Sequence, residues 1–431
     1  MRIGKNLVPL RPGRMGGAEL YFRDLLGELL RRGEHEYLLI TADYNHHSLP
    51  EDTPRCRRIL FAQEGRRAGR RARHVASLAR RLLNRARRAM RPARPGPTLH
   101  DVIRDERLDL WFCPFTNLEP RMPPVPSVIT LFDLQHELHP EFFSPEELAH
   151  RRVFYPESCA SAGRIIAISE FTRRCAIERY GVDPERISTV WLGAAADVDW
   201  AGGREREAEV RAAYRLPERY AFYPANTWGH KNHARLIEAM ARYRGRHGDS
   251  LGLVLTGAGY NGQPQLEASV ATHGLGGVVR ALGVVPRGDL PALYAGAACL
   301  VLPSLFEGFG IPLVEAMLTG CPIAAARGTS IPEVVGDAAA LFDPLDPADI
   351  CRALEAVTRD PEGAADLVRR GRARAALFSV ATMAERTLEI FERARREPVR
   401  CAPSGSSPSI SRSAPASPGR DERRGAWGAR G

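Results

Sequence analysis

Two glutamates, Glu307 and Glu315, are eight residues apart in a stretch that could bind a phosphorylated, hydroxylated ligand. The apolar run at 299–302 predicts a buried strand, and the residues after Gly310 predict a helix. Gly308 and Gly310 flank the helix entrance with no side chain to block a ligand. The unpaired N–H groups at a helix start attract phosphate, and carboxylates can accept hydrogen bonds from hydroxyl groups.

The stretch from Glu307 to Met317 resembles the E-x7-E motif of the retaining GT-B glycosyltransferases of family 4. The residues at 320–323 and 330–344 also resemble that family. The resemblance is dense over residues 220–345 and thinner over 1–200. It implies that Glu307 holds hydroxyl groups of the donor sugar and Glu315 those of the ribose. It also implies that the helix entrance Gly308-Phe309-Gly310 faces the donor.

A lysine follows the first predicted strand of the second half, in Asn226-Thr-Trp-Gly-His230-Lys231. In the family, an arginine and a lysine in this region hold the donor diphosphate, and Lys231 matches the lysine. An ammonium group suits a phosphate, and the chain contains only one other lysine, Lys5. Asn226 stands where the arginine would be. We therefore expect less positive charge at the diphosphate, with Asn226 and His230 as further donor-binding residues.

The first half supplies candidates for the opposite side of the site. A glycine-rich turn precedes a predicted helix at 18–32, and the resemblance implies that Gly16 and Gly17 approach the donor or the acceptor. Many family members place a histidine directly before the aspartate of a later loop, where this chain has Phe132. His136, three residues after that aspartate, is the nearest candidate. We expect His136 at the reaction centre, near the acceptor or the sugar.

Strand and helix patterns alternate through most of the chain, which predicts an α/β fold with mostly parallel sheets. A length of 431 residues leaves room for two domains. We expect two Rossmann-like domains facing across a cleft, the GT-B arrangement, with ligands at the carboxyl ends of the strands. The predicted parts are an acceptor-side domain at 1–195, a nucleotide-sugar-binding domain at 205–378, a helix at 379–397 that packs back toward the first domain, and a disordered tail at 398–431.

The composition, with 44% hydrophobic and 26% charged residues, fits a globular protein in water. The eight cysteines lack C-x-x-C spacing, no signal peptide is recognised, and no apolar run is long enough to span a bilayer. We therefore expect a cytoplasmic protein with reduced thiols.

A basic segment at 66–94 interrupts the α/β pattern. It is rich in arginine and carries a narrow apolar stripe at helical spacing. A basic amphipathic helix can lie on an anionic membrane, which predicts peripheral contact with the inner face of the cytoplasmic membrane. The alternative is a solvated helix whose stripe packs on the domain. No aromatic residues interleave the arginines to stack on bases, so nucleic acid binding is not expected.

The sequence as a whole favours a retaining hexosyltransferase that moves a sugar, mannose being one candidate, from a GDP- or UDP-sugar to a glycan or lipid-linked acceptor. Such an enzyme would serve polysaccharide or glycolipid synthesis. We expect no metal and no cofactor, since Asp197 and Asp199 lie in a predicted linker and the G-x-G-x-x-G at 257–262 lacks the acid that a dinucleotide site needs. A nucleotide-sugar epimerase, a phosphorylase and a non-catalytic scaffold at a membrane remain alternatives.

Overall fold

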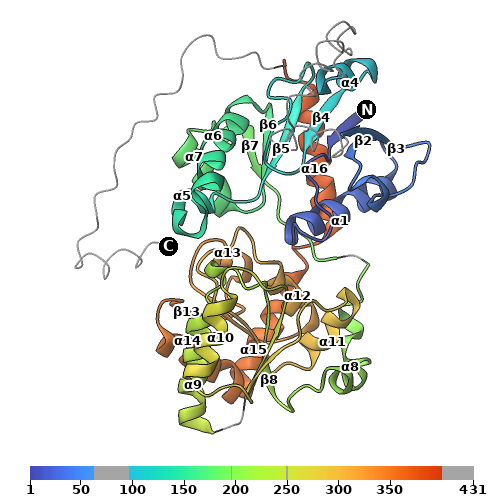
Figure 1. Cartoon of the computed structure of the whole chain (residues 1–431). Coiled ribbons are helices and arrows are strands. Elements are labelled where there is room, and N and C mark those ends of the chain that lie inside the picture. The colour runs from blue at the N-terminus through green and yellow to red at the C-terminus, as the bar shows by residue number, and fades with distance from the viewer. Residues whose placement is uncertain (63–96, 196, 249–250, 400–431) are drawn as a thin grey trace, which may run out of the picture. The chain divides into compact units, whose positions relative to one another are not determined.

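The computed structural model describes residues 1–62, 97–195, 197–248 and 251–399 (Figure 1). The predicted basic segment at 66–94 and the predicted tail from residue 400 onward lie outside the described residues. Most of the predicted strands and helices fall within them.

The first domain is built on a parallel sheet of seven described strands in the order β3-β2-β1-β4-β5-β6-β7. Its central strands are buried and apolar, as a sheet with covered faces requires. The elements are β1 Arg2–Asn6, α1 Gly17–Arg32, β2 Glu36–Ala42, β3 Cys56–Ala62, α4 Leu99–Asp105, β4 Leu110–Cys113, β5 Ser127–Leu131, α5 Gln135–Leu138, α6 Pro145–Ser161, β6 Arg164–Ala167, α7 Glu170–Tyr180 and β7 Ile187–Thr189.

The second domain repeats the plan with six described parallel strands in the order β10-β9-β8-β11-β12-β13. Its elements are α8 Glu207–Tyr214, β8 Tyr220–Pro224, α9 His233–His247, β9 Gly252–Thr256, α10 Gln263–Thr272, β10 Val279–Ala281, α11 Leu290–Ala295, β11 Cys299–Leu302, α12 Ile311–Thr319, β12 Ile323–Ala326, α13 Ile331–Val335, β13 Ala340–Phe342, α14 Pro347–Arg359 and α15 Pro361–Ala375. Two parallel-sheet α/β domains confirm the predicted fold class.

The last described helix, α16 Val380–Arg395, belongs to the packing of the first domain although it follows the second in sequence (Figure 1). It contacts α1, β4, β5 and β6. The Phe391 ring lies 5.0 Å from the Phe112 ring of β4, centroid to centroid, and the Arg32 guanidinium donates to the Ala381 carbonyl at 3.0 Å. The apolar face of α16 therefore completes the core of the first domain.

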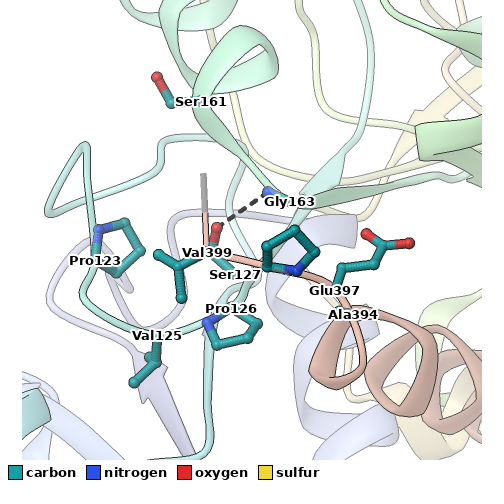
Figure 2. A pocket seen from close by; sticks show the side chains of 10 residues that line it. Pro123, Val125, Pro126, Ser127, Ser161, Gly163, Ala394, Glu397 and Val399 are labelled. Carbon is teal, nitrogen blue, oxygen red and sulfur yellow. Dashed lines mark hydrogen bonds between the residues drawn. The ribbon is translucent and has the colours of Figure 1, made fainter. Parts of the chain in front are cut away.

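The residues after α16 run along the loop that precedes β5 (Figure 2). Val399 and Glu397 line a small cavity there with Pro126 and other residues. The Ser127 hydroxyl accepts a hydrogen bond from the Gly163 N–H at 3.1 Å at the wall of this cavity. The cavity volume is about 10 Å³, which holds at most one water molecule. It is therefore too small to hold a ligand larger than a water molecule.

Lys5 is buried in the centre of the first domain with no exposed surface, and its Nζ has no hydrogen-bond partner. The ammonium position lies 4.6 Å from the centroid of the Tyr37 ring and 5.6 Å from that of Phe112. Burial lowers the Lys5 pKa from 10.5 to about 7, with a smaller opposing effect from Cys56. The side chain therefore carries its charge in the folded protein only at a cost.

Replacing Lys5 by Met should stabilise the protein at pH 6, because Met fills a similar volume without an unpaired charge. Between pH 7 and about 10.5 the unfolded chain binds the Lys5 proton and the folded chain does not, so wild-type stability should rise with pH by about 1.4 kcal/mol per unit. The midpoints of urea unfolding at pH 6, 7 and 9.5 measure the stabilisation by Lys5→Met and the rise of wild-type stability with pH. The stability of Lys5→Met should lack the part of that rise that comes from Lys5. Lys231→Met is the matched control and should not be stabilised. A lower midpoint for Lys5→Met at every pH would contradict the argument.

Candidate active site

Two loops at one edge of the second sheet form the candidate site. β8 and β11 are neighbouring parallel strands, so the loops that follow them leave the same edge of the sheet. The loop after β8 carries Asn226 and Lys231, and the loop after β11 carries Glu307. The Leu305 N–H donates to the His230 carbonyl at 2.8 Å and holds the two loops together.

An ion pair joins the predicted site residues Lys231 and Glu307. Lys231 Nζ lies 2.7 Å from Glu307 Oε1, and the two side chains keep 19% and 11% of their exposure. The Lys231 backbone is fixed, because its carbonyl accepts from the Tyr223 hydroxyl at 2.9 Å. The next residue, Asn232, donates through Nδ2 to the Pro303 carbonyl at 3.0 Å. The ammonium and the carboxylate are therefore held together in a partly desolvated place.

Thr329 and Ser330 hold the Glu307 turn from the loop after β12. The Glu307 N–H donates to Thr329 Oγ1 at 3.2 Å. The Ser330 hydroxyl donates to the carbonyls of Glu307 at 2.9 Å and Phe309 at 3.1 Å. Thr329 has φ +53°, a left-handed conformation that is strained for a β-branched residue. Strain of this kind persists only where the surroundings enforce it, and it is concentrated at functional sites.

The turn that opens α12 depends on its glycines. Gly310 has φ +99°, which a residue with a Cβ rarely adopts. A Cβ on Gly308 would collide with the Phe132 carbonyl oxygen of the first domain. Phe309 between them is 2% exposed and packs in the core. Gly308 and Gly310 therefore shape the backbone beside Glu307, whereas the buried Phe309 side chain packs behind the turn.

Glu315 lies on α12 and is only 6% exposed. Its Oε2 accepts a hydrogen bond from the Tyr294 hydroxyl at 2.7 Å. Burial raises the Glu315 pKa to about 7, and the Tyr294 hydrogen bond and the Arg287 charge oppose that rise. A carboxylate held in this way would gain from a ligand hydroxyl that donates to it.

The Asn226 side chain forms a hydrogen bond to the neighbouring loop. Asn226 Oδ1 accepts from the Ala258 N–H at 2.7 Å, and Thr227 Oγ1 accepts from the Tyr260 N–H at 2.7 Å. These bonds join the loop after β8 to the G-x-G-x-x-G turn after β9. The amide oxygen of Asn226 is thus engaged in loop structure, and Asn226 brings no charge to the site. His230 is a neutral neighbour, since burial, followed by the charges of Lys231, His139 and His233, lowers its pKa to about 3.

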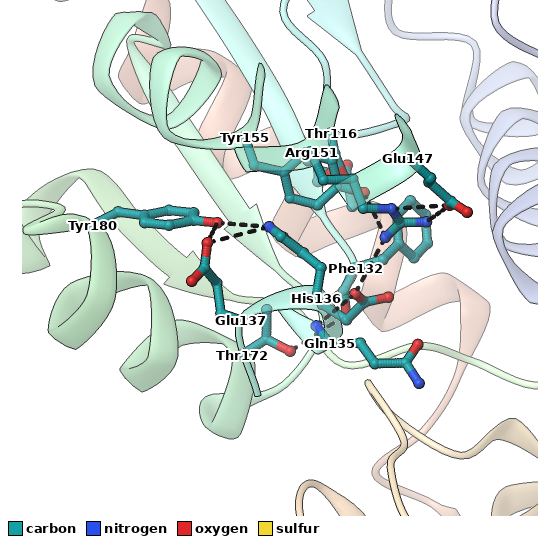
Figure 3. A network of polar contacts seen from close by, with 12 residues as sticks. Thr116, Phe132, Gln135, His136, Glu137, Glu147, Arg151, Tyr155, Thr172 and Tyr180 are labelled. Carbon is teal, nitrogen blue, oxygen red and sulfur yellow. Dashed lines mark hydrogen bonds and ion pairs between the residues drawn. The ribbon is translucent and has the colours of Figure 1, made fainter. Parts of the chain in front are cut away.

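The prediction that His136 lines the reaction centre is corrected by the structure (Figure 3). The side chain has no exposed surface, and its Nε2 lies 2.9 Å from the Tyr180 hydroxyl. That hydroxyl donates to Glu137 at 3.1 Å, so His136 Nε2 carries the proton donated to the Tyr180 oxygen. Burial, followed by the charges of Arg151 and Arg152, lowers the His136 pKa to about 4. His136 is therefore a neutral core residue that anchors its loop within the first domain.

Gly16 and Gly17 lie at the exposed start of α1, where an added Cβ would meet no atom within 4 Å. The Gly13 N–H of the same turn donates to Glu19 Oε2 at 2.7 Å. The structure records no contact between these described glycines and Lys231 or Glu307. Their role at the donor stays a prediction. An ion pair between Asp24 of α1 and Arg287 of the second domain, at 3.1 Å, links the two domains.

Glu333, a second-domain residue whose carboxylate accepts hydrogen bonds from the first domain, was not identified from the sequence. Its carboxylate accepts the backbone N–H groups of Glu170 at 2.7 Å and Phe171 at 3.0 Å, at the start of α7. It also accepts from Trp191 Nε1 at 2.7 Å. A carboxylate at a helix N-terminus is favoured by the helix dipole. In the sequence Glu333 lies in the stretch Ser330-Ile-Pro-Glu333, which resembles the family but does not by itself indicate a contact with the first domain.

Within the described residues no helix combines the length and the apolar composition needed to cross a bilayer. The described His, Cys, Asp and Glu side chains also form no group of three or more placed to hold a metal ion. The seven cysteines in the described part of the chain are free and buried.

Comparison with known proteins adds to this geometry. Residues 15–197 match the family model described as Glycosyltransferase Family 4, and residues 206–374 match the model described as Glycosyl transferases group 1. The chain is 31% identical over 269 residues to an O-antigen chain mannosyltransferase B from Escherichia coli, a match that covers 62% of this chain and 70% of that protein. The chain belongs to the family 4 glycosyltransferases.

A second relative is an MMP alpha-(1->4)-mannosyltransferase from Mycolicibacterium hassiacum, 31% identical over 53% of this chain and 54% of that protein. Among solved structures, Anabaena Alr3699/HepE in complex with UDP and glucose superposes with a TM-score of 0.65 at 20% identity, covering 91% of this chain and all of that one. A sucrose-phosphate synthase from Thermosynechococcus elongatus superposes with a TM-score of 0.67 at 20% identity, covering 91% and 98%. At this identity the structures show a shared GT-B fold, as predicted.

For this family 4 member we expect Thr329→Gly to separate stability from activity. Glycine relieves the left-handed strain of about 1 kcal/mol but removes the Oγ1 that holds the Glu307 N–H. The melting temperature should stay level or rise, while turnover falls about tenfold. Thr329→Ser keeps the hydroxyl and should retain near-normal turnover. Equal turnover of the Gly and Ser variants would show that this hydrogen bond does not matter for catalysis.

Proposed function

We propose that this glycosyltransferase moves a hexosyl residue from a nucleotide-sugar to a hydroxyl group of a glycan or lipid-linked acceptor, with retention at the anomeric carbon and without a metal. The observation that carries the proposal is the Lys231–Glu307 pair, whose Nζ and Oε1 lie 2.7 Å apart beside a glycine-lined helix entrance. A cation for phosphate and a carboxylate for sugar hydroxyls are the two groups that such a donor needs.

In the proposed reaction Lys231 binds the donor diphosphate and stabilises the charge that develops as it leaves. The backbone N–H groups at the start of α12 add to that stabilisation. Glu307 then exchanges its bond to Lys231 for bonds to donor sugar hydroxyls, and Glu315 accepts from the ribose. Same-face attack, in which the leaving phosphate helps to deprotonate the acceptor hydroxyl, needs no separate base.

The proposed diphosphate site has less positive charge than that of family members that carry an arginine at the position of Asn226. Asn226 is neutral and its amide oxygen holds Ala258, and His230 is neutral at physiological pH. Lys231 therefore carries most of the charge that the loop after β8 offers. We expect this chain to depend on its lysine more strongly than a relative that also has the arginine.

The names of the relatives support a mannosyl donor and a cell-surface glycan product, and the solved neighbours include one with bound UDP. We propose a GDP- or UDP-hexose, with mannose as the first sugar to test. A panel of nucleotide-sugars read by thermal shift, followed by release of nucleoside diphosphate, tests the donor. The anomeric configuration of the product by NMR tests retention. Turnover unchanged by a chelator is expected if no metal takes part.

Lys231→Ala and Glu307→Ala should each remove at least 99% of transferase turnover, because each takes away a group that contacts the donor. The melting temperature should fall modestly, because each variant leaves one partner of a mostly withdrawn ion pair uncompensated, so turnover is compared at a temperature at which the variants are folded. Arg242→Ala is the matched control, because Arg242 forms an exposed ion pair with Glu238 on α9 at 2.9 Å. Near-normal rates in both site variants would refute the site assignment. A donor-only change of configuration would indicate an epimerase, and no donor binding at all would indicate a scaffold.

The two lysines of the chain allow a direct probe of Lys231. Lys5 is buried, so an amine-selective reagent applied to the folded protein should modify Lys231 and the N-terminal amine. Peptide mapping should show that a nucleoside diphosphate protects Lys231 and leaves the N-terminal amine reactive. Equal modification with and without nucleotide would contradict phosphate binding by Lys231.

For localisation we propose a cytoplasmic enzyme that contacts the inner face of the membrane through residues 66–94. Deleting these residues should abolish co-sedimentation with vesicles containing anionic lipid, because the arginines supply the attraction. Binding by the full chain should weaken at high salt, and vesicles of neutral lipid serve as the control. Unchanged sedimentation after the deletion would remove the membrane role of this segment.

A further inference from the structure

The loop at 132–143 of the first domain packs directly on the two site loops. The Phe132 carbonyl lies against Gly308, as the collision of an added Cβ shows. At the other end of the loop, a Cβ on Gly229 would lie 3.3 Å from the Phe142 ring, and that ring lies 5.8 Å from the His230 ring, centroid to centroid. The loop therefore borders the Lys231–Glu307 pair from the first domain.

His139 is the histidine that this loop presents toward the site. Its ring lies 6.0 Å from that of Phe306, the residue directly before Glu307, and 5.7 Å from that of Phe142. The side chain keeps 31% of its exposure, whereas His136 in the same loop has none. His139 can therefore meet a ligand and His136 cannot.

Glu141 selects the tautomer of His139. His139 Nδ1 lies 3.0 Å from Glu141 Oε1. A carboxylate only accepts hydrogen bonds, so Nδ1 carries the proton and the neutral ring keeps an acceptor lone pair on Nε2. In the second domain, Lys231 and the backbone N–H groups at the start of α12 donate, while the carboxyl groups of Glu307 and Glu315 accept. His139 Nε2 adds a neutral acceptor from the first domain.

We propose that His139 Nε2 accepts a hydrogen bond from a carbohydrate hydroxyl group during glycosyl transfer, with Glu141 as the positioning residue that holds the ring tautomer. The inference rests on the proposed transferase function. The hydroxyl belongs either to the transferred sugar or to the acceptor, and these sources share the chemistry of an O–H donor.

Three substitutions of His139 separate hydrogen bonding from packing. Gln places its amide oxygen near the position of Nε2, Asn reaches only toward that of Nδ1, and Phe keeps the ring against Phe306 without an acceptor. We expect kcat/KM to fall less than threefold for His139→Gln and about tenfold or more for His139→Asn and His139→Phe. His150→Gln, at an exposed histidine stacked on Phe154 of α6, is the control and should match wild type. A Phe variant as active as Gln or better would overturn the proposal.

Glu141→Ala should lower kcat/KM severalfold in the wild-type background and have no further effect in His139→Gln, since the amide has no tautomer to select. Equal effects in both backgrounds would overturn the positioning role. If the His139→Phe variant has a raised KM for the acceptor, the hydroxyl belongs to the acceptor. If that variant instead has a raised Kd for the donor, the hydroxyl belongs to the transferred sugar. If the wild type transfers sugar, Glu307→Ala does not, and His139→Phe does so at the normal rate, the proposed function stands and this inference alone is refuted. Absence of transfer by wild type would remove both.

Discussion

The Lys231–Glu307 ion pair is the interaction on which the candidate site depends. Both side chains are mostly withdrawn from water, so each would be costly to keep there without the other. The pair also ties the loop after β8 to the loop after β11, and the Leu305–His230 backbone bond does the same. A donor diphosphate would take over the ammonium and release the carboxylate for sugar hydroxyls. In the free protein the two charges compensate each other.

The surroundings are arranged to keep this pair in place. Thr329 accepts strain at φ +53° to hold the Glu307 N–H, and Asn226 gives its amide oxygen to the neighbouring turn after β9. Gly308 leaves room for the backbone of the first domain, and Glu333 binds the start of α7. Three of these residues depart from a relaxed or typical choice: Thr329 has a strained backbone, Asn226 brings no charge, and Gly308 has no side chain. The contacts of Gly308 and Glu333 are the ones among these that bring first-domain residues against the second-domain loops.

The two lysines of this arginine-rich chain show opposite uses of the same group. Lys231 is paired and partly exposed, and an amine there can bind phosphate as a compact charge. Lys5 is enclosed by aromatic rings without a partner, and its lowered pKa reflects that burial. Arginine could not replace Lys5 in this way, because a guanidinium does not lose its proton in proteins.

The sequence by itself determined the fold class and the family, because these follow from local patterns of residues. It also singled out Lys231 and Glu307, and only the structure shows that their side chains form an ion pair. Alternating apolar runs predict parallel strands, and parallel strands bring their carboxyl ends to one edge. The tertiary structure decided which side chains of the first domain face that edge. His136 and His139 are three residues apart in one loop, yet one is buried against Tyr180 and Tyr155 and the other meets Phe306. Nearness in sequence could not distinguish them, because the direction of each side chain depends on packing partners that lie 19 to 167 residues away along the chain.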